Sequence, residues 1–187
     1  MPEPATSERP GRPADTTRTG FIHVYTGEGK GKTTAAMGLA LRSLGHGRRV
    51  FIGQFMKPGT SGEIAALACH DGVDVRHYGS GRFVFSEPDE LERRGARDGV
   101  ESALEALAGG GYDLVVLDEI DVALACGLVT LDDCRRLMAA RPDDVELVFT
   151  GRSAPPEIVA GADLVTEMRE IKHYFRRGVS AREGIEY

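Results

Sequence analysis

The sequence has no tryptophan, only three cysteines and no long apolar run. Cys69, Cys126 and Cys134 are widely spaced and form no C-x-x-C pair, so neither a disulfide framework nor a zinc site is expected. No stretch approaches the roughly 20 apolar residues of a membrane-spanning helix, and no apolar segment typical of a secretory signal opens the chain. The net charge of −6 argues against a broad nucleic-acid-binding surface. We therefore expect a cytoplasmic protein with reduced thiols that binds neither membranes nor nucleic acid.

The 187 residues suffice for one domain, and 41% hydrophobic content is that of an ordinary globular protein. Residues 1–20 hold four of the nine prolines and no large apolar side chain except Met1. Such a segment cannot bury enough surface to offset the entropy of ordering. We predict a flexible tail over residues 1–20 and a single domain over residues 21–187.

Within that domain, apolar strand-like runs alternate with helix-like segments. The predicted strands are 21–25, 49–55, 73–78, 112–117, 145–149 and 163–167, and the predicted helices are 33–45, 62–70, 86–108 and 130–141. The third helix is expected to start at Ser86, with Pro88 in its first turn. Alternating strands and helices with continuous apolar strands favour a mostly parallel sheet covered by helices on both faces.

The most informative motif is residues 26–34, Thr-Gly-Glu-Gly-Lys-Gly-Lys-Thr-Thr, which lies between the first strand and the first helix. A strand, a glycine-rich loop with Gly-Lys-Thr and a helix are typical of a phosphate-binding loop. The first glycine is Gly27, one position later than in the usual pattern. Lys32 is predicted to reach the β- and γ-phosphates, and Thr33 to offer its hydroxyl to Mg²⁺. The sequence thus predicts a phosphate-loop (RecA-like) α/β domain that binds a nucleoside triphosphate.

A buried strand ends in two acids, Asp118 and Glu119. In phosphate-loop proteins a carboxylate at such a strand end lies near the Mg²⁺ that the loop hydroxyl holds. The alternative is that the two acids only cap the helix that follows. Lys57 and residues 150–152 also follow strands directly, so all these groups are expected to face one crevice at the carboxyl edge of the sheet.

Here the sequence resembles a known family, the ATP:corrinoid adenosyltransferases of the cob(I)yrinic acid a,c-diamide or cob(I)alamin type. The resemblance rests on the phosphate loop with its displaced glycine and covers roughly residues 21–187. The matching segments are 24–36, 42–47, 54–57, 115–119, 150–152, 162–168, 171–173 and 184–187.

The resemblance implies transfer of the 5′-deoxyadenosyl group of ATP to Co(I) of a reduced corrinoid, with release of triphosphate, in adenosylcobalamin synthesis or salvage. It implies that Lys32, Thr33 and Glu119 are catalytic, and that Thr33, Glu119 and Asp118 hold Mg²⁺, or Mn²⁺ in its place. The implied ATP-binding residues are Gly27, Glu28, Gly29, Lys30, Gly31, Lys32, Thr33, Thr34, Arg42, Lys57 and Arg152. It also implies ATP bound in reverse, a homodimer and a flavodoxin-like reductant.

The resemblance further assigns Phe83 and Phe85 to the lower face of the corrinoid, where aromatic side chains displace the lower cobalt ligand. Relatives can carry tryptophan at the second site, which this chain lacks. The alternative is that both phenylalanines belong to the core. Some relatives close the site with a basic N-terminal helix, which the proline-rich residues 1–20 are not expected to form.

Two other functions remain open from the residues alone. A nucleoside kinase of the thymidine-kinase type has a similar core, although its usual zinc-binding cysteine cluster is absent from this sequence. A nucleotide-dependent switch or partition-type ATPase would use Asp118 and Glu119 to orient water. The reaction product separates these functions, because adenosyl transfer releases triphosphate whereas a kinase or ATPase releases ADP.

Overall fold

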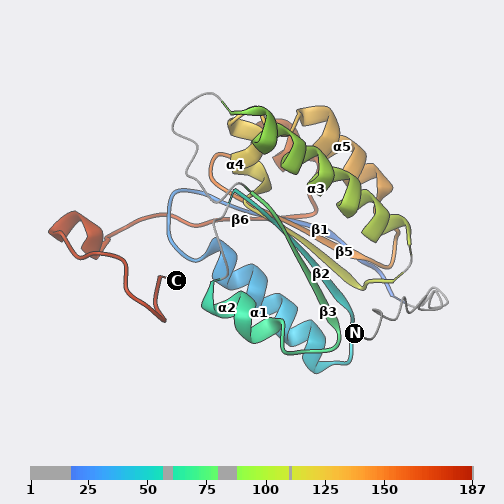
Figure 1. Cartoon of the computed structure of the whole chain (residues 1–187), viewed down its shortest axis with the longest axis horizontal. Coiled ribbons are helices and arrows are strands. Elements are labelled where there is room, and N and C mark those ends of the chain that lie inside the picture. The colour runs from blue at the N-terminus through green and yellow to red at the C-terminus, as the bar shows by residue number, and fades with distance from the viewer. Residues whose placement is uncertain (1–17, 57–60, 80–87, 110, 187) are drawn as a thin grey trace, which may run out of the picture.

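The computed structural model describes residues 18–56, 61–79, 88–109 and 111–186. They form one six-stranded sheet in the order β3-β2-β4-β5-β1-β6 (Figure 1). The strands are β1 (Ile22–Thr26), β2 (Val50–Phe55), β3 (Val73–Tyr78), β4 (Leu114–Asp118), β5 (Glu146–Thr150) and β6 (Leu164–Glu167). All five strand pairings are parallel, which confirms the predicted α/β class.

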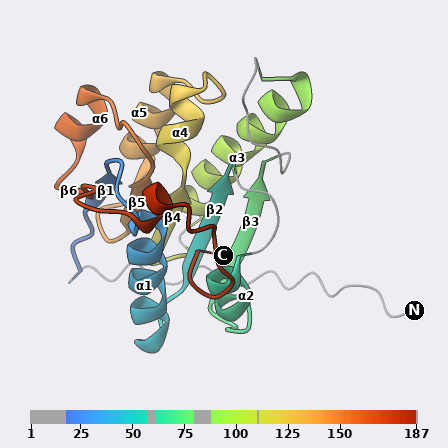
Figure 2. The same ribbon diagram turned by 90° about the vertical axis from the view of Figure 1, so that its left-hand side faces the viewer.

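Helices cover both faces of the sheet (Figures 1 and 2). One face carries α1 (Lys32–Gly45) and α2 (Gly62–Leu67). The other carries α3 (Glu90–Ala108), α4 (Ile120–Ala125), α5 (Leu131–Ala140) and α6 (Pro156–Gly161). The chain moves along the sheet in one direction from β1 to β3 and returns from β3 to β6. Because parallel crossovers are right-handed, this reversal places the later helices on the opposite face.

The core follows from this layering. The strands β2 and β4 are buried along their whole length, as continuous apolar runs in a parallel sheet should be. One buried cluster centres on Phe51, Leu117 and Phe149 and packs under α3, α4 and α5. A second contains Ala36, Ile52 and other small or branched residues, and packs under α1 and α2. Edge strand β6 is exposed throughout.

Two helix starts show how the local sequence is used. The predicted cap at Thr130 is confirmed: its hydroxyl accepts the Asp133 N–H, and the Asp133 carboxylate accepts the Thr130 N–H, which is a capping box. The start of α3 is different from the prediction. Its cap is Asp89, paired reciprocally with Glu92, so Pro88 precedes the helix instead of lying in its first turn.

The domain reaches further toward the N-terminus than expected. The guanidinium of Arg18 pairs with the Asp113 carboxylate, and the Gly20 N–H donates to the Asp143 carbonyl at 2.6 Å. Residues 18–20, which we expected in the tail, are therefore anchored to the body, while residues 1–17 lie outside the described part. None of the described helices is long and apolar enough to cross a membrane.

Candidate active site: a phosphate loop facing two carboxylates

The loop between β1 and α1 has the backbone shape that its glycines permit. Gly27 and Gly31 lie at φ 97° and 119°, in the left-handed region that side chains disfavour. A Cβ on Gly27 would also lie 2.5 Å from the Met168 carbonyl oxygen. The displaced glycine is therefore required where it stands, because residue 27 both turns the chain and meets the backbone that follows β6.

That backbone holds the loop in place. The Met168 N–H donates to the Thr26 carbonyl at 2.8 Å, and the Gly29 N–H donates to the Met168 carbonyl at 2.6 Å. A Cβ on Gly29 would approach the Met168 carbonyl to 2.7 Å, so this position also needs glycine. In this conformation the Gly29 amide would have to release Met168 before it could contact a phosphate.

Lys32 begins α1 and folds back over the loop. Its side chain is mostly buried, and Nζ donates to the carbonyls of Gly27 at 2.5 Å and Gly29 at 2.8 Å. Burial lowers the pKa of the Lys32 ammonium, and the neighbouring Glu119 carboxylate opposes that shift. A desolvated cation whose partners among the described residues are loop carbonyls is suited to turn toward a triphosphate.

Asp118, the last residue of β4, meets Thr33 in the first turn of α1. The Thr33 hydroxyl donates to Asp118 Oδ1 at 2.9 Å. The same oxygen accepts the Thr150 hydroxyl at 2.7 Å, and the other carboxylate oxygen accepts Gln54 Nε2 at 3.1 Å. The Asp118 carboxylate is fully buried. It orients the Thr33 hydroxyl from behind.

Glu119 occupies the turn from β4 into α4. Its φ of 62° is a left-handed conformation, and its N–H donates to the Thr150 hydroxyl at 2.9 Å. The side chain makes no capping bond to α4, although the residue stands at the cap position. Glu119 instead lines the same pocket as Lys32 and Thr33.

These oxygen groups fit a magnesium ion. Mg²⁺ prefers oxygen ligands and keeps several waters or phosphate oxygens in its shell, so it needs few protein ligands. The described residues contain no group of three or more His, Cys, Asp or Glu side chains arranged to hold a metal. Thr33 and Glu119, with Asp118 behind Thr33, form a small hard-donor set of the kind that a nucleotide-bound Mg²⁺ uses.

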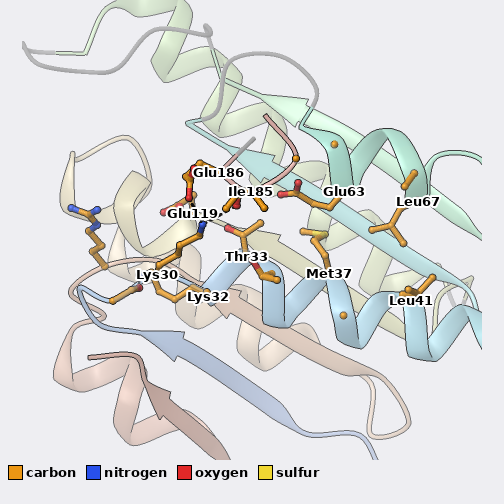
Figure 3. A pocket seen from close by; sticks show the side chains of 18 of the residues that line it. Lys30, Lys32, Thr33, Met37, Leu41, Glu63, Leu67, Glu119, Ile185 and Glu186 are labelled. Carbon is orange, nitrogen blue, oxygen red and sulfur yellow. Dashed lines mark hydrogen bonds and ion pairs between the residues drawn. The ribbon is translucent and has the colours of Figure 1, made fainter. Parts of the chain in front are cut away.

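The pocket has a volume of about 940 Å³, within the range of small-molecule sites. Figure 3 shows a polar end with Lys30, Lys32, Thr33 and Glu119, and an apolar end where Met37 and Leu41 of α1 face Leu67 of α2. Residues that follow β6 supply a further wall, comprising Glu170, His173, Phe175, Gly184, Ile185 and Glu186.

The structure brings most of the predicted site together. Residues 28–34, Glu119 and Arg152 all line the pocket, and the Arg152 guanidinium lies 3.5 Å from the Glu28 carboxylate. Arg42 does not line the pocket: it is an exposed residue in the last turn of α1, about 15 Å along the helix from Lys32. Lys57, Phe83 and Phe85 lie outside the described residues.

Several contributors were missed by the reasoning from individual residues. Thr150 was placed at the strand edge, but nothing indicated that its hydroxyl would join Asp118 to the Glu119 backbone. Gln54 and the segment after β6 were noticed only through family resemblance. For Gln54 a signal did exist, because a polar side chain inside a fully apolar strand usually has a buried partner.

The fold and the site define a phosphate-loop nucleotide-binding protein. A family model described as ATP:corrinoid adenosyltransferase BtuR/CobO/CobP matches residues 18–187, and the chain belongs to this family. The corrinoid adenosyltransferase of Escherichia coli (strain K12) is 38% identical over 170 residues, covering 90% of this chain and 86% of that protein. The Pseudomonas aeruginosa corrinoid adenosyltransferase is 36% identical, covering 90% of this chain and 84% of its own.

Corrinoid adenosyltransferase CobA of Salmonella typhimurium is also 38% identical, with 90% of this chain and 86% of that protein covered. Among solved structures, the flagellar accessory protein FlaH from Methanocaldococcus jannaschii superposes with a TM-score of 0.56 at 16% identity, covering 80% of this chain and 71% of its own. FlaH supports the fold alone. Family membership identifies an ATP:corrinoid adenosyltransferase, so the kinase and switch alternatives are not favoured.

Proposed function

We propose that this enzyme transfers the 5′-deoxyadenosyl group of ATP to the Co(I) centre of a reduced corrinoid. Co(I) donates an electron pair to C5′ to form the Co–C bond, while the bond between C5′ and the triphosphate oxygen breaks and its electron pair leaves with the triphosphate. The product is an alkylated Co(III) corrinoid. The observation that carries the proposal is the family match, which spans the phosphate loop and both carboxylates.

The residues of the pocket suit such a leaving group. Lys32 would turn from the carbonyls of Gly27 and Gly29 toward the triphosphate, where its charge stabilises the developing anion. Thr33, oriented by Asp118, and Glu119 would hold Mg²⁺, with Mn²⁺ as a substitute. The metal ion would neutralise charge on the departing triphosphate. No general base is required, since the nucleophile is a reduced metal centre.

The two ends of the pocket support a placement for ATP. The triphosphate would lie at the polar end, and the apolar end formed by Met37, Leu41 and Leu67 offers a surface for the rest of the nucleotide. The C5′ atom would then lie between the two ends. The reversed orientation of ATP, with the ribose presented to cobalt, rests on the family resemblance.

Phe83 and Phe85 are proposed to shield the lower face of the corrinoid, a proposal that rests on the family resemblance alone. Replacing both with alanine should reduce turnover from Co(II) far more than turnover from chemically prepared Co(I), with ATP affinity unchanged. If both belong to the core, the two reactions should fall together and the melting temperature should collapse, since each lost ring costs about 3–5 kcal/mol.

The family resemblance also motivates the proposals of a homodimer, a cytoplasmic location and a flavodoxin-like reductant. The decisive experiment concerns the reaction itself. The protein is incubated with ATP, Mg²⁺ and chemically reduced corrinoid, and the light-sensitive spectrum of the adenosyl–cobalt bond is followed while phosphate products are separated. Triphosphate released in step with that spectrum supports the proposal. ADP formation without an adenosyl–cobalt product would overturn it.

A further inference from the structure

The segment after β6 is tied to the phosphate loop through one side chain. Lys30 Nζ donates to Glu186 Oε1 at 2.7 Å, to the Ile185 carbonyl at 2.8 Å and to the Tyr174 hydroxyl at 3.3 Å. An ammonium group has three protons, so these three acceptors use its whole donor capacity. In this conformation, Lys30 is committed to the C-terminal segment, whereas the described partners of Lys32 Nζ are the loop carbonyls of Gly27 and Gly29.

Glu186 is the centre of that contact. Its Oε1 also accepts the Tyr174 hydroxyl, and its Oε2 accepts the Arg182 N–H at 2.7 Å. The Arg182 guanidinium stacks 4.7 Å from the centre of the Tyr174 ring. These donors hold the pKa of the Glu186 carboxyl below its usual range, and Glu186 raises the pKa of Lys30 in turn. The Glu186 carboxylate therefore joins Tyr174 and Arg182 within the C-terminal segment and connects this segment to Lys30 of the phosphate loop.

The fastened segment is a wall of the nucleotide pocket. Gly184, Ile185 and Glu186 line the same cavity as Lys32, Thr33 and Glu119. In Figure 2 the C-terminal segment crosses the end of α1 that follows the phosphate loop, and in Figure 3 Glu186 and Ile185 lie on the side of the pocket opposite α1. The Glu186 side chain is only 16% exposed, against 37% for Lys30, so the contact is partly shielded from water.

We propose that Glu186 is a positioning residue that, through Lys30, latches the segment from Glu170 to Glu186 against the phosphate loop as the closing wall of the ATP site. The inference rests on the proposed function only in taking the pocket as an ATP site. In this proposal, Lys32 contacts the triphosphate directly, whereas Lys30 affects ATP binding by holding the C-terminal segment in place. Both members of the pair thus work as a unit, so losing either should have the same effect as losing both.

A double-mutant cycle on ATP binding tests this latch without corrinoid. Kd for ATP with Mg²⁺ is measured by isothermal titration for Glu186→Gln, Lys30→Met and the double variant. Each of the three should raise Kd by about fivefold, the size expected for a partly exposed ion pair with several hydrogen bonds. Glu183→Gln and Lys172→Met, which make the same changes at exposed positions of the same segment, should leave Kd unchanged.

Limited trypsin digestion reports on the wall itself. Cleavage after Arg176, Arg177 and Arg182 should be slowed by ATP in the wild-type protein, and accelerated in Glu186→Gln whether or not ATP is present. In turnover, Glu186→Gln should raise KM for ATP with little change in kcat, since the residue does not touch the reacting atoms.

Three results would overturn the latch. A much larger loss for Lys30→Met than for Glu186→Gln, with additive effects, would mean that Lys30 binds triphosphate directly. A tighter Kd in Glu186→Gln would mean that the carboxylate competes with ATP. Unchanged Kd for ATP in both single variants would mean that Glu186 and Lys30 have no role in ATP binding. Failure of adenosyl transfer in an enzyme that shows the expected cycle would contradict the proposed function and leave the latch standing.

Discussion

Replacing Thr150 should most clearly test how Asp118 and Glu119 are held together, because one hydroxyl contacts both residues. Its hydroxyl donates to Asp118 Oδ1 at 2.7 Å and accepts the Glu119 N–H at 2.9 Å, and the residue is fully buried. In Thr150→Val the shape is preserved, but a buried carboxylate loses one donor and a buried backbone N–H loses its acceptor. Hydrogen bonds to charged groups contribute about 1.5–3 kcal/mol, and an unsatisfied N–H costs about 1–3 kcal/mol.

The added methyl group recovers about 0.8 kcal/mol, so we expect Thr150→Val to lower the free energy of unfolding by about 2–5 kcal/mol. Mg²⁺-dependent ATP binding should weaken as well, because Glu119 loses the bond that fixes its left-handed backbone. Urea denaturation measures the first effect, and titration calorimetry at several Mg²⁺ concentrations measures the second.

Two control variants sharpen the test. Thr150→Ser keeps the hydroxyl and should retain Mg²⁺-dependent ATP binding, at a stability cost near 1 kcal/mol for the lost methyl. Thr166→Val makes the same exchange on exposed strand β6 and should change neither quantity. The reasoning would be refuted if Thr150→Val unfolded within 0.5 kcal/mol of the wild-type protein, an order-of-magnitude limit for surface substitutions, and bound ATP with an unaltered Mg²⁺ requirement.

Three further predictions follow from the same site. Lys32→Ala should abolish adenosyl transfer and weaken ATP binding by about 2–5 kcal/mol; unchanged affinity in titration calorimetry of the folded variant would contradict the assignment. Glu119→Gln should raise the Mg²⁺ concentration needed for half-maximal activity, and a superimposable Mg²⁺ titration would move the metal role elsewhere. Among the described residues, neither carboxyl oxygen of the buried Asp121 has a hydrogen-bond partner, and burial raises the pKa of Asp121 to about 7. Because the folded protein disfavours the charged form, Asp121 costs nothing below its unfolded pKa near 4 and destabilises progressively as pH rises toward 7. Asp121→Asn should therefore gain stability relative to wild type by about 2–4 kcal/mol between pH 4 and pH 8 in urea titrations, and a difference independent of pH would disprove this origin.

The sheet and its phosphate loop could be predicted because each depends on local sequence patterns. Continuous apolar runs gave all six strands to within about two residues at each end, the usual uncertainty of such boundaries. The capping box at Thr130 is also local, because the partner of Thr130 is Asp133, three residues away. Short helices carry a weaker pattern: α4 and α6, of six residues each, were missed, whereas α2, also of six residues, lies within the predicted helix 62–70.

The site could be predicted only as far as its strand ends. Thr33 and Asp118 were expected near one another, but the order of strands, with β5 between β1 and β4, cannot be read from sequence periodicity. That order is what inserts Thr150 between them. The role of Arg42 in ATP binding rests on the resemblance alone and stays a prediction, because the structure places this residue in the last turn of α1.

The contact between the phosphate loop and Met168 has a consequence for the order of folding. The loop is synthesised early, yet its turn at Gly27 and Gly29 is held by backbone that follows β6, the last strand to leave the ribosome. Strand β6 pairs only with β1, so nothing else in the sheet can substitute for it. A nascent chain in which residues 21–150 have emerged therefore has the nucleotide-binding motif without its shape. We expect the loop to reach the shape described here in a late step, when β6 docks, after most of the chain has been made.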